Sequence, residues 1–155
     1  VYGPFGTWDG GREKAPAAIC RKVIEAKETG SGRIEIWGDG NQTRSFMYID
    51  DCLKGIDLIM HCERLIATPI NLGSSELVLI NRLVDIIEEI AGVKLEREYK
   101  IEAPRGVAGR NSDNTFIREV LGWEPSLPLR EGLEKTYRWI EQQYLDRRRG
   151  KRTVS

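Results

Sequence analysis

Residues 3–18, with the sequence GPFGTWDGGREKAPAA, constrain the fold of this chain more than any other stretch. Their glycines and prolines favour a loop that turns tightly around another group, and they disfavour a helix or a strand. Pro16 has a fixed φ that suits the first turn of a helix, so the loop is predicted to lead directly into one. Glu13 and Lys14 then lie at or just before the helix N-terminus, where the lysine is a candidate for proton transfer. The alternative is an ordinary surface loop with solvated charges.

The rest of the chain alternates helical and extended patterns. Apolar residues at helical spacing predict helices over residues 16–28, 50–61, 81–92, 115–121 and from 130 onward. Extended patterns predict strands over residues 33–37, 42–49, 69–73 and 93–101. Asp50 and Asn81 are the expected N-caps of the second and third helices, and Gly92 is the expected end of the third. The expected apolar stripe of the second helix consists of Leu53, Ile56, Ile59 and Met60. This order of elements predicts an α/β fold, with α+β as the alternative.

Composition excludes several classes of function. The formal net charge is zero, with 24 basic and 24 acidic residues, so a broad basic face for nucleic acid is not expected. Three cysteines and one histidine are too few for a zinc site or a disulfide framework. We see no apolar run of membrane-spanning length and no signal peptide. The sequence therefore predicts a cytoplasmic protein that has no metal site.

The start of the chain suggests that it is part of a longer protein. It begins at Val1, without an initiator methionine, in what looks like a strand that leads into the glycine-rich loop. It also contains no G-x-G-x-x-G motif, the fingerprint of a dinucleotide site. We therefore expect any dinucleotide site to lie upstream of Val1.

Cations lie on three glycine-punctuated segments and on the helix that follows the first of them. These cations are Arg12, Lys14, Lys22, Arg44, Arg105 and Arg110. Glycine-rich loops free backbone N–H groups, and arginine offers a planar fork for phosphate oxygens. The pattern therefore indicates a phosphate or nucleotide-sugar site. The alternative is that each arginine is an ordinary surface ion-pair partner, because such pairs are common and weak.

Five segments carry a resemblance to a known family. They are VYGPFGTWDGGREKAPAA, WGDGNQTRSFMYIDD, INLGSSE, GVAGRNSDN and LGWEP. The chain resembles, from Val1 to about Gln143, the C-terminal half of the nucleotide-sugar epimerases and dehydratases of the extended short-chain dehydrogenase/reductase family. The first segment and the GRNSDN motif are the most specific of these signals. Ala108 departs from the pattern, since the family has an arginine at this position.

The resemblance implies a fold and a reaction. Residues 1–146 would be a C-terminal substrate-binding lobe, with segments that complete a Rossmann sheet in the intact protein. Residues 147–155 would be a basic tail, which we expect to be disordered because like charges repel. The implied substrate is a GDP-mannose-like nucleotide sugar, which is epimerised at C3 and C5 after NAD-dependent oxidation at C4. The NAD site would belong to an N-terminal half that is missing here, and assembly into a homo-oligomer stays open.

The resemblance also implies roles for single residues. Lys14 matches the lysine of an acid/base pair whose cysteine partner belongs to the other half. The positions that match substrate contacts are Glu13, Lys14, Ala15, Lys22, Gln42, Thr43, Arg44 and Arg110. None of these positions would bind the cofactor.

Two alternatives to this interpretation remain. The intact protein could be another NAD-dependent epimerase, dehydratase or decarboxylase that acts on a different nucleotide sugar. The isolated chain could be a non-catalytic nucleotide-sugar-binding fragment, because the NAD loop and the Tyr-x-x-x-Lys pair of the family are absent. We expect the isolated chain to be inactive, and unpaired strand edges such as residues 69–73 should make it self-associate or lose stability.

Overall fold

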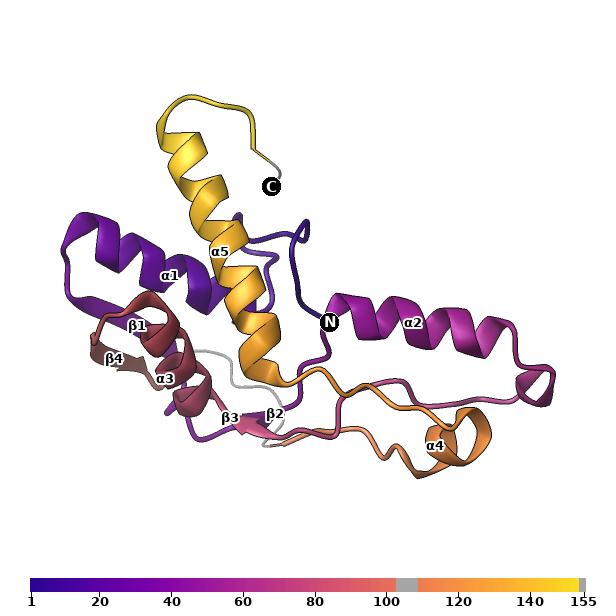
Figure 1. Ribbon diagram of the computed structural model, residues 1–155. Coiled ribbons are helices and arrows are strands. Elements are labelled where there is room, and N and C mark those ends of the chain that lie inside the picture. The colour runs from indigo at the N-terminus through magenta and orange to yellow at the C-terminus, as the bar shows by residue number, and fades with distance from the viewer. Residues whose placement is uncertain (103–108, 154–155) are drawn as a thin grey trace.

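Two helices, α1 (Ala15–Thr29) and α5 (Leu129–Arg148), pack against each other at the centre of the structure (Figure 1). The computed structural model describes residues 1–102 and 109–153. Val23 and Ile24 of α1 and Leu133 and Ile140 of α5 are fully buried in this interface and its surroundings. The first and last helices predicted from apolar spacing are therefore confirmed. The spacing predicts them because it marks the face that each helix buries.

A third helix, α3 (Ile80–Ala91), completes the core by packing against both α1 and α5. Leu83, Val84 and Ile87 are fully buried, as their spacing predicted. Gly92 ends the helix with a φ of 68°, a left-handed conformation that glycine adopts without a Cβ clash. The predicted N-cap was wrong. The helix begins at Ile80, and Asn81 lies inside its first turn, where its amide donates to the carbonyl of Asp39.

Two strands, β1 (Arg33–Trp37) and β4 (Glu96–Lys100), form a parallel pair in register from Arg33 opposite Glu96 to Trp37 opposite Lys100. Ile34 and Ile36 are buried, while the alternate residues of β1 face outward. The strand predicted over residues 33–37 is confirmed. The strand predicted over residues 93–101 is shorter than expected because only 96–100 pair with β1.

Two shorter strands, β2 (Thr43–Arg44) and β3 (Val78–Leu79), pair antiparallel beside the core. The extended run predicted over residues 42–49 is therefore much shorter than expected. Tyr48 still forms a parallel bridge with Tyr2, and the amide of Ile49 donates to the Tyr2 carbonyl at 2.9 Å. This bridge ties the start of the chain to the start of the next helix.

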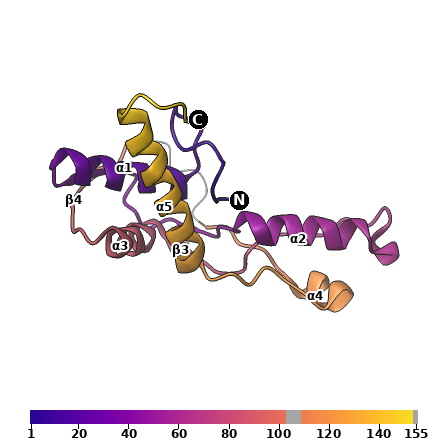
Figure 2. The same cartoon turned by 45° about the horizontal axis from the view of Figure 1, so that its top comes forward.

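One arm of the structure lies to the side of this core. It contains α2 (Ile49–Met60), the short 3₁₀ helix η1 (Glu63–Leu65) and α4 (Thr115–Leu121) (Figures 1 and 2). The apolar stripe predicted for α2 exists, but Leu53, Ile56 and Met60 are exposed by 58%, 44% and 77%. The predicted N-cap was also wrong, since Tyr48 occupies that position and Asp50 lies in the first turn.

Residues 69–73 do not form the predicted strand in the described part of the chain. A strand needs a neighbour for its backbone N–H and C=O groups, and these residues pair with no described strand. Local apolar character alone was therefore not sufficient to produce a strand.

The basic C-terminal residues differ from the expected disordered tail at their start. Arg147 and Arg148 belong to α5, and they form ion pairs with Asp9 and Glu28 at 2.6 and 3.3 Å. Opposite charges on the loop and on α1 explain why these two positions are ordered. Residues 154–155 lie outside the described part of the chain.

The fold class is α/β, as the sequence predicted. Within the described residues we find no helix with the length and apolar character needed to cross a membrane.

Candidate functional site

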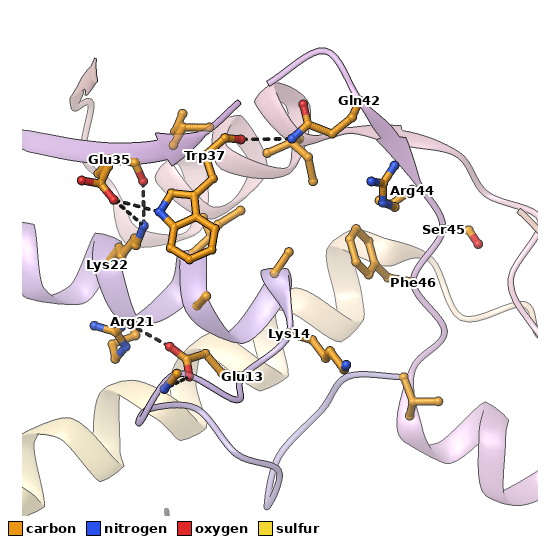
Figure 3. A pocket seen from close by; sticks show the side chains of 17 residues that line it. Glu13, Lys14, Arg21, Lys22, Glu35, Trp37, Gln42, Arg44, Ser45 and Phe46 are labelled. Carbon is orange, nitrogen blue, oxygen red and sulfur yellow. Dashed lines mark hydrogen bonds and ion pairs between the residues drawn. The ribbon is translucent and has the colours of Figure 1, made fainter. Parts of the chain in front are cut away.

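A cavity of about 670 Å³ opens between the N-terminal end of α1, the end of β1 and the strand β2 (Figure 3). The residues of its wall come from segments that are distant in the sequence. Predicted site residues on this wall are Glu13, Lys14, Ala15, Lys22, Gln42 and Arg44. The structure thus brings together most of the side chains to which the sequence assigned substrate contacts.

Lys14 stands where the glycine-rich loop becomes α1. It occupies the N-cap position with φ −79° and ψ 160°, and its side chain is exposed. It also lines a second cavity of about 600 Å³, together with Arg12 and residues of the loop. Lys14 can therefore reach a group bound on either side of it.

Glu13 turns its carboxylate toward the protein. Glu13 Oε1 accepts from Arg21 Nη2 at 3.0 Å and Oε2 accepts from the Gly11 amide at 2.7 Å, which leaves the side chain 6% exposed. Burial alone would raise the pKa of this carboxyl, but hydrogen bonds from backbone amides and from Arg21 outweigh it and lower the pKa. Glu13 is thus an ionised anchor for the loop.

Lys22 reaches the cavity from the second turn of α1. Its Nζ donates to the carbonyl of Glu35 at 2.9 Å and lies 3.8 Å from the carboxylate of the same residue. The ring of Trp37 covers the amine, with 5.8 Å between Nζ and the ring centroid (Figure 3). Burial lowers the pKa of Lys22, because the charged form loses hydration.

Gln42 and Arg44 supply polar groups from the other wall. The amide of Gln42 donates to the carbonyl of Trp37 at 3.1 Å, while Gln42 Oε1 is buried and has no hydrogen-bond partner among the described residues. Arg44 donates from Nη1 to the carbonyl of Thr43 at 2.7 Å and stays half-buried. A buried acceptor without a partner is costly unless a ligand or water satisfies it. This acceptor and the nearby cations suit an anionic ligand that also carries a donor.

Two of the sequence-predicted contacts do not lie on the cavity wall. Thr43 faces Gly109, where an added Cβ would lie 2.5 Å from Thr43 Oγ1. Arg110 follows Gly109 and is exposed. Arg105 and Ala108 lie outside the described residues. The predicted cations on the cavity wall are therefore Lys14 from the first glycine-punctuated segment, Lys22 from α1 and Arg44 from the second segment.

The residues of the wall that sequence reasoning missed include Glu35, Trp37 and Phe46. The alternation in β1 could have found the first two, since it places Glu35 and Trp37 on the same outward side of the strand. Alternation over residues 42–49 gives a signal for Phe46 too, because it places Phe46 on the same face as Gln42 and Arg44.

The described residues contain no group of three or more His, Cys, Asp or Glu side chains that could hold a metal ion. The three cysteines, Cys20, Cys52 and Cys62, are not paired with one another.

Comparison with known proteins gives the class of the chain. Residues 1–73 match the model of the NAD dependent epimerase/dehydratase family. The fold agrees, because UDP-glucuronic acid 4-epimerase from Bacillus cereus, solved with NAD, superposes with a TM-score of 0.77 at 29% identity. That match covers 94% of this chain and 42% of the solved one. The chain belongs to the NAD dependent epimerase/dehydratase family.

Within this family the chain is similar to GDP-mannose 3,5-epimerase 1 of Oryza sativa subsp. indica. The two are 49% identical over 143 residues, which is 92% of this chain and 36% of the relative. The epimerase Mth375 of Methanothermobacter thermautotrophicus gives a TM-score of 0.81 at 25% identity, covering 97% of this chain and 44% of that one. The chain thus spans about a third of the length of the rice protein. The resemblance seen in the sequence motifs is confirmed.

Proposed function

We propose that this chain is the substrate-binding half of an NAD-dependent nucleotide-sugar epimerase, and that its cavity binds a GDP-mannose-like substrate. The observation that carries the proposal is the gathering of Lys14, Lys22, Gln42 and Arg44 around one cavity of about 670 Å³. Its volume lies in the range of small-molecule sites. The identity of 49% to a GDP-mannose 3,5-epimerase supports the choice of substrate.

In this proposal, Lys22 and Arg44 bind the diphosphate of the substrate. Both are cationic and half-buried, so their attraction for phosphate is less screened than at an exposed site. The unsatisfied Gln42 Oε1 accepts a hydrogen bond from the substrate. Thr43 and Arg110 do not line the cavity, so the family motifs alone support them as further substrate contacts.

Lys14 moves a proton at C3 or C5 of the sugar. The cofactor, which a preceding half of the protein would hold, supplies oxidation at C4 and so acidifies the neighbouring protons. The exposed position of Lys14 on the walls of two cavities supports this role. Its amine must lie within hydrogen-bond reach of the proton that it moves. We place this reaction in the cytoplasm because the three cysteines are unpaired.

A second candidate is another epimerase, dehydratase or decarboxylase that acts on a UDP sugar. The fold match to UDP-glucuronic acid 4-epimerase favours it. The chain by itself would bind a nucleotide sugar without turning it over. Detectable turnover by the 155-residue chain with added NAD would contradict that expectation.

The function is tested in the longer protein by incubating GDP-mannose in heavy water and following deuterium at C3 and C5. We expect incorporation at both positions, and Lys14→Met should slow it by about 10²-fold or more, as for loss of a general acid or base. Lys27→Met is the matched control, because Lys27 pairs with Glu141 and does not line the cavity. Turnover of GDP-mannose without exchange at C3 and C5 would overturn the proposed reaction.

A further inference from the structure

The loop that precedes α1 has a backbone that needs support from the rest of the fold. Phe5, Gly10 and Gly11 have φ values of 65°, 95° and 84°. Positive φ is unfavourable for Phe5, and the two glycines gain no rigidity from a Cβ. A loop of this kind keeps one conformation only when surrounding groups determine it. Because Lys14 is at its end, whatever holds the loop also places Lys14.

Helix α5 supplies two of these contacts. Near the middle of the helix, the Trp139 ring lies 5.5 Å from the Phe5 ring, measured between centroids. At its C-terminal end, Arg147 lies with Cζ 4.3 Å from the ring centroid of Trp8, which is 1% exposed. The same guanidinium donates from Nη1 to Asp9 Oδ2 at 2.6 Å. Arg147 therefore holds two consecutive loop residues at once.

A series of ion pairs links Asp9 to the residue before Lys14. Asp9 Oδ1 accepts from the Gly10 amide at 2.8 Å and lies 3.4 Å from Arg21 Nε, an ion-pair distance without hydrogen-bond geometry. Arg21 in turn binds Glu13, which precedes Lys14. Burial alone would raise the pKa of Asp9, but the bonds from Arg147 and Gly10 outweigh it and lower the pKa. The carboxyl groups of Asp9 and Glu13 in this series are thus ionised at neutral pH.

We propose that Arg147 is a positioning residue for the site: from the end of α5, through Trp8 and Asp9, it fixes the loop that presents Lys14 to the cavity. The consequence for ligand binding rests on the proposed function. The anchoring of the loop does not, because it follows from contacts within the chain.

Arginine suits this place better than lysine. A planar guanidinium stacks on the Trp8 ring while its edge donates to Asp9, whereas an ammonium would keep the charge and lose the stacking. An isolated exposed ion pair contributes little, and the side chains of Arg147 and Asp9 are 40% and 37% exposed. The stacking on Trp8 and the ion pair with Asp9 together allow Arg147 to fix the loop.

The anchoring is tested by amide hydrogen exchange in the 155-residue chain. Arg147→Ala should speed exchange at Gly10 and Gly11 by about tenfold, the sum of a lost cation–π contact and a lost ion pair. Arg147→Lys should give an intermediate rate. Arg148→Ala is the matched control, since it removes the same charge from the same helix end but pairs with Glu28. Unchanged exchange at Val23 shows that the core of each variant is intact. Equal exchange at Gly10 and Gly11 in all variants would overturn the inference.

The consequence for the site is tested by titrating the same variants with GDP-mannose. We expect Arg147→Ala to weaken binding by about tenfold and Arg148→Ala to leave it unchanged. Unchanged binding by Arg147→Ala, with a loosened loop, would show that the anchor does not position the site. If no variant binds, and the parent chain does not, the proposed function fails for this chain and the exchange rates alone decide whether Arg147 anchors the loop.

Discussion

Lys22 donates a hydrogen bond from Nζ to the backbone carbonyl of Glu35 at 2.9 Å, and this bond joins α1 to β1 at the wall of the cavity. The Glu35 carboxylate forms a longer ion pair with the same amine, at 3.8 Å. The Trp37 ring lies over the amine, with 5.8 Å between Nζ and the ring centroid. The Lys22 amine is therefore already fixed at the cavity wall before an anionic ligand binds.

Replacement of Lys22 should weaken nucleotide-sugar binding specifically. A hydrogen bond to a charged group contributes about 1.5–3 kcal/mol, so Lys22→Ala should lower the affinity for GDP-mannose by about 10- to 100-fold. Calorimetric titration of the 155-residue chain measures this change. Lys27→Ala, which removes a lysine from the same helix outside the cavity, should leave the affinity unchanged. An equal loss in both variants would point to general attraction by positive charge.

The same lysine should make binding depend on pH. Burial lowers the pKa of Lys22 below its usual 10.5, so the amine loses its proton at a lower pH than a solvated lysine. Affinity for a diphosphate should therefore fall as the pH rises toward 10.5. The stability of the free chain should rise over the same window, because the unfolded chain there binds more protons than the folded one. Titrations at several pH values test this, and Lys22→Arg should flatten the curve because arginine stays charged.

A partly buried ion cluster between α3 and β4 should stabilise the fold. Its members are Asp85, Glu88, Lys94 and Arg97. Glu88 is 2% exposed, and its Oε2 accepts from Arg97 at 3.0 Å and from Lys94 at 2.8 Å. Arg97 also pairs with Asp85. Arg97→Met should lower the free energy of unfolding by about 2–3 kcal/mol, because it leaves buried carboxylate charge with too few partners. Urea unfolding measures the loss.

The control for this cluster is Arg82→Met, whose ion pair with Glu89 is exposed on both sides and should change stability by about 0.5 kcal/mol or less. The pH dependence has a definite sign. Burial raises the pKa of Asp85, but Arg97 outweighs it and lowers the pKa below 3.8. Its contribution is therefore complete above pH 3.8 and is lost as the pH falls further. Carboxylates titrate between about pH 5 and about pH 2. A free energy of unfolding that does not change over this range would contradict the assignment.

Helix boundaries and buried faces could be predicted because they depend on local spacing. The face of α3 with Leu83 and Ile87 is an example, since residues three and four apart lie on one side of a helix. Caps could not be predicted in the same way. Tyr48 and Leu79 precede their helices with an extended backbone and no side-chain cap, so neither Asp50 nor Asn81 is used as expected.

Contacts between residues that are distant in the sequence could not be predicted, and this limited the prediction of both the fold and the site. Residues 69–73 have the composition of a strand, but composition cannot supply a neighbouring strand. In the site, family motifs indicated Lys14 and Lys22, while nothing in the local sequence connects Arg147 with Asp9, 138 positions earlier. Contacts of this kind follow only from the packing of α5 beside the loop.

Close packing at Gly132 should make this position intolerant of a side chain. A Cβ there would lie 2.1 Å from Tyr2 Oη and 2.9 Å from Tyr48 Cδ2. Tyr2 cannot move freely, because it is 6% exposed and its hydroxyl donates to the Leu129 carbonyl at 3.1 Å. Gly132→Ala should thus lower the free energy of unfolding by about 1–3 kcal/mol, despite the better helix propensity of alanine. Gly6→Ala is the control, since its nearest group would be 3.7 Å away.

The exposed face of α2 should make the isolated chain self-associate. Leu53, Ile56 and Met60 lie on this helix with large exposed fractions, and a side chain of this type contributes about 1.5–3 kcal/mol when it is buried. After the cost of association, we expect a weak dimer with a dissociation constant on the order of 100 µM. Sedimentation equilibrium measures it. The double variant Leu53→Glu/Met60→Glu should be monomeric, because like charges would face each other in the contact. Asp57→Lys changes charge on the same helix without removing apolar surface and should still associate. A parent chain that remains monomeric at millimolar concentration would show that this face does not attract a second copy.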